Sequence, residues 1–121
     1  MKEFRSIEDV DRANLSEGLH EAVRGTLTTL MDAYAEIGER YNPEVDGHTV
    51  LIEEGDTEET IRTAIGGHTL LDAPLEGVVH DEKRQCFNTC ILFNNQFGIS
   101  IVVPDAPWLD PEIRARLVAE S

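Results

Sequence analysis

The sequence is short of basic residues, of cysteine and of long apolar runs, and each shortage excludes a class of protein. Ten Lys and Arg against 24 Asp and Glu in 121 residues leave a formal net charge of −14. Such a charge disfavours direct binding to nucleic acid or to an anionic membrane. No apolar run approaches the roughly 18 residues of a membrane span, and no apolar signal segment follows Met1. We therefore expect a cytoplasmic protein that has neither a nucleic-acid nor a membrane partner.

Two cysteines are too few for a disulfide framework. Cys86 and Cys90 lie in a stretch that is expected to be a strand, where residues four apart share a face but are roughly 13 Å apart. A disulfide needs Cα atoms within about 7 Å, so we expect both thiols to be reduced. With a mass of 13.5 kDa and 40% hydrophobic residues, the chain has the size of one domain, residues 1–121, with its own core.

The clearest helical pattern spans Ser16–Arg40. Its apolar residues recur at steps of three or four and so lie on one face of a helix: Leu19, Val23, Leu27, Leu30, Tyr34, Ile37 and Tyr41. Asn42-Pro43 is expected to end this helix. Shorter helices are predicted after Ser6, Thr57 and Asp110, whose side chains are typical N-caps.

Strands are predicted in the rest of the chain. Residues 48–53 are β-branched and apolar, and residues 75–80 form a weaker candidate. Phe87–Val103 alternates, turns at Asn94-Asn95-Gln96 and returns, which predicts an antiparallel hairpin. The order of elements predicts a two-layer α+β fold, with a long N-terminal helix and shorter helices packed on one face of a small antiparallel sheet.

The negative charge is concentrated in the middle of the chain. Residues 44–82 hold one basic and eleven acidic side chains, a net charge of −10. The densest part contains Glu53, Glu54, Asp56, Glu58 and Glu59. One interpretation is a solvated loop and helix start, where acids complement the helix dipole. The other is a surface that binds a basic protein, such as one that itself binds nucleic acid.

No convincing catalytic or metal-binding constellation is present, so we predict a non-enzymatic binding protein without a cofactor or metal. The alternative is a small ligand- or metal-binding, hydrolase-like domain that uses His80, Cys86 and Cys90. These residues lack the spacing of common zinc sites and converge only if the chain bends between them. Phe87 and Ile91 beside the cysteines indicate buried thiols rather than an activated nucleophile.

Self-association is the remaining expectation from composition. Tyr34, Tyr41 and Trp108 are amphipathic side chains of the kind that anchor interfaces. A two-fold homodimer is the commonest oligomer, and we predict one here.

Two stretches resemble small acidic proteins that are carried on bacterial integrative and other mobile elements. One runs from Tyr41-Asn42-Pro43-Glu44 through Gly47-His48 to Val50–Asp56, and the other from Phe97-Gly98 to Val103-Pro104, followed by a helix with an acidic cap. The resemblance implies a bacterial, cytoplasmic accessory protein that acts by binding, in regulation or counter-defence. It assigns no catalytic or ligand-binding residue.

Overall fold

A mixed five-stranded sheet organises the chain. The computed structural model describes residues 1–40, 42, 48–93 and 96–121, without the side chains of residues 92, 93, 96 and 97. The strand order is β1-β2-β5-β4-β3, and the strands are β1 (Lys2–Phe4), β2 (Thr49–Leu51), β3 (Glu76–Asp81), β4 (Cys86–Phe93) and β5 (Gln96–Pro104). Neighbouring described strands are antiparallel except β2 and β5, which are parallel.

The predicted hairpin is confirmed. In β4 and β5, Phe87 lies opposite Val103 and Ile91 opposite Ile99. Its turn residues 94 and 95 lie outside the described part of the chain. β3 extends the hairpin on its other side, which confirms the weaker strand candidate.

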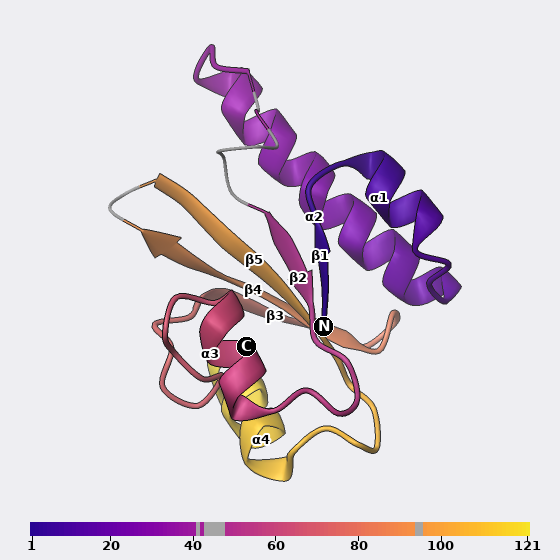
Figure 1. Cartoon of the computed structure of the whole chain (residues 1–121), viewed down its shortest axis with the longest axis vertical. Coiled ribbons are helices and arrows are strands. Elements are labelled where there is room, and N and C mark those ends of the chain that lie inside the picture. Colours follow the sequence, from indigo (N-terminus) through magenta and orange to yellow (C-terminus); the bar gives the residue numbers. More distant parts are fainter. Residues whose placement is uncertain (41, 43–47, 94–95) are drawn as a thin grey trace.

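Helices cover both faces of the sheet (Figure 1). α1 (Ile7–Arg12) and α2 (Glu17–Glu36) lie on one face, and α3 (Glu58–Ala64) and α4 (Pro111–Glu120) lie on the other. Two apolar clusters follow from this arrangement, one containing Val102 under α2 and one containing Ile101 and Val103 under α3 and α4. The α+β fold with a long helix packed on the sheet is confirmed. The expectation that all helices share one face of a fully antiparallel sheet is corrected, because successive β5 side chains are buried on opposite faces.

The long helix is shorter than predicted. α2 starts at Glu17 and ends at Glu36 rather than near Arg40. Gly38 has φ of 75°, its N–H donates to Ala35 O at 3.0 Å, and the N–H of Glu39 donates to Tyr34 O at 2.9 Å. A glycine in this left-handed conformation lets the N–H groups that follow the helix bond to its last free carbonyl oxygens. The helix therefore ends before Pro43 could end it.

The predicted N-caps begin the short helices. Ser6 Oγ accepts a hydrogen bond from Asp9 N, and Asp110 accepts one from Glu112 N. Thr57 and Thr60 bond reciprocally at the start of α3. Each cap satisfies an N–H group that lacks a partner within its helix.

The sequence pattern missed β1. It has only three residues, and its pairing with β2 places Phe4 opposite Thr49 and Glu3 opposite Val50. Three residues carry too little alternation to predict a strand.

Within the described residues, no helix combines the length and the apolar character needed to cross a bilayer.

Candidate functional site: the acidic surface beside α3

The five predicted site residues lie together on the β2–α3 connection and the first turn of α3, and we call them the α3 acidic surface: Glu53, Glu54, Asp56, Glu58 and Glu59. The connection leaves the sheet at Leu51 and enters α3 after its cap at Thr57. The acids in the first turn of α3 lie at the positive end of the helix dipole. The structure thus brings the predicted residues together, but it gives them two different roles.

Glu53 and Asp56 hold the amino-terminal strand in place. The Met1 amino group lies 2.9 Å from Asp56 Oδ1 and 3.0 Å from Glu53 Oε1, and Lys2 Nζ lies 2.7 Å from Glu53 Oε2. The hydrogen bond from Lys2, with the Met1 amino group beside it, keeps the pKa of Glu53 below its usual value. Asp56 Oδ2 also accepts the N–H of Glu53 at 2.7 Å. Glu53 is therefore a partly buried carboxylate in ion pairs rather than a free one.

Glu54, Glu58 and Glu59 are exposed. None of their three side-chain carboxylates forms a hydrogen bond or an ion pair with another residue that the structure describes. Arg62, one turn further along α3, is the only basic residue in this segment and is also exposed. Three carboxylates on one side of the molecule therefore face solvent without an ion pair, and Arg62 is the basic side chain nearest to them on α3.

A groove of about 520 Å³ lies at the edge of this surface, between β1 and α3. Glu3 on β1 and Glu59 on α3 line it together with Asp56, Thr60 and Ala64. Glu3 was not predicted as a site residue, because its only signal is its place in a strand too short to recognise. Met1 also lines the groove, and its amino group already pairs with Asp56. The carboxylates of Glu3 and Glu59, together with a hydroxyl group and an apolar patch, are the chemistry that a Lys or Arg side chain requires.

The sheet separates His80 from Cys86 and Cys90, which lie on its other face. The ring of His80 stacks on Phe87, which belongs to the core under α3 and α4. Cys86 belongs to the core on the α2 face, and Cys90 lines a hollow on that same face. Burial raises the pKa of Cys86 to about 11 and also raises the pKa of Cys90. The alternative site built from these three residues is not assembled, and both thiols are poor nucleophiles.

The structure gives His80 a different partner. His80 Nε2 lies 3.1 Å from Asp105 Oδ2, and Arg114 donates to both oxygens of Asp105 at 2.8 and 3.2 Å. The hydrogen bond from Arg114, followed by that from His80, lowers the pKa of Asp105. This cluster joins β3 to the segment after β5 and to α4. It contains no nucleophile, so it is suited to holding elements together rather than to catalysis.

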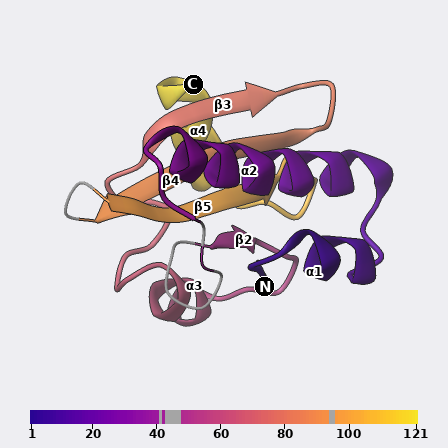
Figure 2. The ribbon, with the colours of Figure 1, turned by 90° about the horizontal axis from the view of Figure 1, so that it is seen from above.

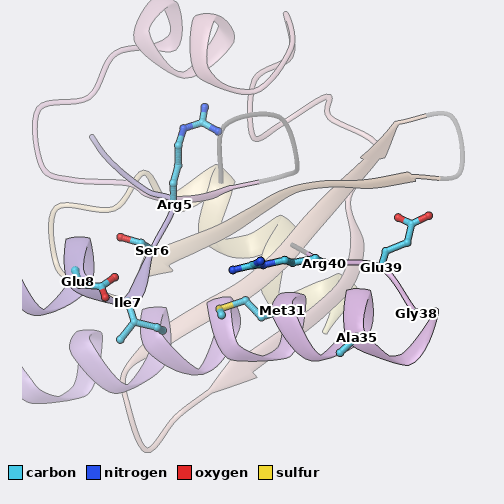
Figure 3. Close-up of a pocket in the computed structure, with 9 residues that line it drawn as sticks. All are labelled: Arg5, Ser6, Ile7, Glu8, Met31, Ala35, Gly38, Glu39 and Arg40. Atoms are coloured by element: carbon cyan, nitrogen blue, oxygen red, sulfur yellow. The ribbon is translucent and has the colours of Figure 1, made fainter. Parts of the chain in front are cut away.

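A larger hollow of about 700 Å³ lies between the β1–α1 junction and the C-terminal half of α2. Figure 3 shows Arg40 lying along α2 above Met31, whereas Arg5 points away from the helix. Glu8 and Glu39 line the same hollow, so two carboxylates oppose two guanidinium groups. The hollow therefore does not favour a ligand of either charge.

Within the described ranges, no three His, Cys, Asp or Glu side chains gather as ligands for a metal ion. Comparisons of the chain with protein-family models, with curated proteins and with solved structures gave no match.

Proposed function

We propose that this protein is a non-enzymatic binding protein whose α3 acidic surface engages a basic protein partner. The observation that carries the proposal is the set of three exposed carboxylates, Glu54, Glu58 and Glu59, none of which forms an ion pair with another described residue. Neighbouring Glu53 and Asp56, by contrast, already pair with the Met1 amino group and Lys2. A partner with Lys or Arg side chains would supply the missing positive charge.

The groove beside the surface supports the same proposal. A basic side chain that enters between Glu3 and Glu59 lies between two carboxylates and packs its methylene groups on Ala64. A negative field of this kind speeds the encounter with a basic partner and makes association sensitive to salt. The resemblance to accessory proteins of bacterial mobile elements agrees with a role in binding, and we propose such an accessory role.

Affinity capture with three baits tests the proposal. The first bait is the wild-type protein, and the second carries Glu54→Gln, Glu58→Gln and Glu59→Gln. The third carries Glu17→Gln, Asp32→Asn and Glu36→Gln on α2, where these side chains are also exposed. Both variants remove three negative charges, so they differ only in where the charge is lost.

We expect a basic protein that the wild-type and α2 baits retain, that the acidic-surface bait loses, and that elutes as salt is raised. With that partner purified, the acidic-surface variant should associate several-fold more slowly. Equal retention by all three baits would show that the surface serves only solubility. Equal loss from both variants would show that total charge alone matters.

A further inference from the structure

The sheet face under α2 contains one residue that does not suit its surroundings. Asn88 lies in β4, with Val102 opposite it on β5 and Val79 opposite it on β3. Asparagine is depleted in strands, whereas valine is favoured. A third valine at this position would continue the apolar row across the sheet.

The carboxamide of Asn88 has only weak partners in the described structure. Its Oδ1 lies 3.5 Å from the hydroxyl of Thr26, which donates instead to Ala22 O at 2.9 Å. Its Nδ2 lies 3.9 Å from Cys86 Sγ, and sulfur is a weak acceptor. A half-buried amide without good hydrogen bonds lowers stability, and a bound ligand would supply the bonds that it lacks.

Asn88 lies in a groove of about 410 Å³ between α2 and the sheet. The groove exists because α2 crosses the middle strands and leaves β3 beside it, as Figure 2 shows. Leu30 and Ala33 of α2 form one wall, and Val79, which is 55% exposed, forms the other. None of the described residues that line it is an acid or a base, although 28% of the chain is charged.

We propose that this groove binds an uncharged small molecule that carries an amide-like donor and acceptor on an apolar body. The carbonyl and amino groups of Asn88 lie side by side and can form two hydrogen bonds with such a group. The apolar body would pack against Leu30, Ala33 and Val79. Both the size and the mostly apolar lining with few polar groups are typical of small-molecule sites.

The lining of the groove holds no charge, and the charged side chains of the adjoining hollow, Glu21, Asp81 and Arg84, pair with one another. Together these features select a neutral ligand. An anion would enter a groove without a cation in a protein of net charge −14, and a cation would lose its hydration without gaining a carboxylate. This site lies on the α2 face, away from the α3 acidic surface. A negative result for this site would therefore not count against the proposed function, and a negative result for the proposed function would not count against this site.

Titration with benzamide and benzoate tests the proposal, because the two probes share a shape and differ in charge and in the amide donor. We expect benzamide to shift the backbone NMR signals of Thr26, Asn88 and Cys90 in a saturable manner. Benzoate should bind at least tenfold more weakly. Equal binding of the two probes, or benzamide shifts confined to another part of the molecule, would overturn the proposal.

Two variants separate a ligand role of Asn88 from a structural one. Asn88→Val should weaken benzamide binding about tenfold or more and at the same time raise the midpoint of urea unfolding. Thr28→Ala, on the exposed side of α2, is the control and should leave benzamide binding unchanged. A lower unfolding midpoint for Asn88→Val would show that the asparagine is structural and would overturn the proposal. Unchanged benzamide binding by Asn88→Val would also overturn the proposal.

Discussion

Single side chains join segments of this protein that are far apart in sequence. The guanidinium group of Arg116 on α4 donates to Leu70 O at 2.7 Å and to Ala73 O at 2.6 Å. Asp105 binds both Arg114 on α4 and His80 on β3. Such contacts hold α4 and the irregular segment before β3 against the sheet. They also make stability depend on the ionisation of Asp105.

We predict that Asp105→Asn lowers the free energy of unfolding at pH 7 by up to about 1 kcal/mol. The pKa of Asp105 is depressed in the folded protein from its ordinary value of 3.8. Its contribution is therefore complete above that value and is lost as the pH falls through the folded pKa. The difference between wild type and variant in urea unfolding should narrow as the pH falls below about 4.

Asp32→Asn provides the control, since Asp32 is exposed on α2. It should change the unfolding curve little at any of these pH values. A difference for Asp105→Asn that grows as the pH falls would contradict the assigned direction of the pKa shift.

At the scale of elements, α2 contains two glycines in different surroundings. A Cβ atom at Gly18 would lie 3.2 Å from the carbonyl oxygen of Arg84, in the β3–β4 connection, whereas a Cβ atom at Gly25 would meet nothing within 4 Å. Gly18 thus allows the start of α2 to approach that connection closely. Gly25 has no such packing role.

We predict that Gly25→Ala raises the free energy of unfolding by about 0.5–1 kcal/mol, because alanine loses less backbone entropy than glycine in a helix. Gly18→Ala should raise the free energy of unfolding by less than Gly25→Ala does, because the backbone carbonyl of Arg84 has to move. Urea unfolding of both variants measures the difference. A larger gain at Gly18 would contradict the close approach to Arg84.

The same elements show which structural features a local sequence pattern can predict and which it cannot. The cap at Thr57, the glycine stop after Ile65 and the β4–β5 hairpin all depend on residues close in sequence, and each was predictable. The end of α2 was not, because two stop signals compete, and Gly38 closes the helix before Pro43. The start of each shorter helix is set by one capping side chain, but the end of α2 depends on which of several candidate stops is used first.

At the scale of the whole molecule, electrostatic self-repulsion is the dominant consequence of a net charge of −14. We predict that the free energy of unfolding rises as NaCl is increased from about 20 to about 300 mM, because the screening length falls from about 20 to about 6 Å. Urea, which carries no charge, is the suitable denaturant. A decrease in stability would show that the ion pairs, such as Lys2 with Glu53, outweigh the repulsion.

The predicted homodimer remains a prediction. Of its three proposed anchors, Tyr34 is buried, Trp108 packs against the core under α4, and Tyr41 lies outside the described residues. An interface would therefore have to use other side chains. Among the residues whose side chains the structure describes, Met31, Ile37 and Val79 are large apolar groups on the α2 side that remain exposed to solvent.

The sequence by itself determined the helix starts, the hairpin and the location of the acidic segment, because each depends on residues that are neighbours along the chain. Only the tertiary structure decided which acids are free. Glu53 is neutralised by Lys2, 51 residues away, whereas Glu54 beside it is not. It also decided that both faces of the sheet are covered and that Asn88 lies between two valines. These features depend on strand pairing between distant segments, which no local pattern encodes.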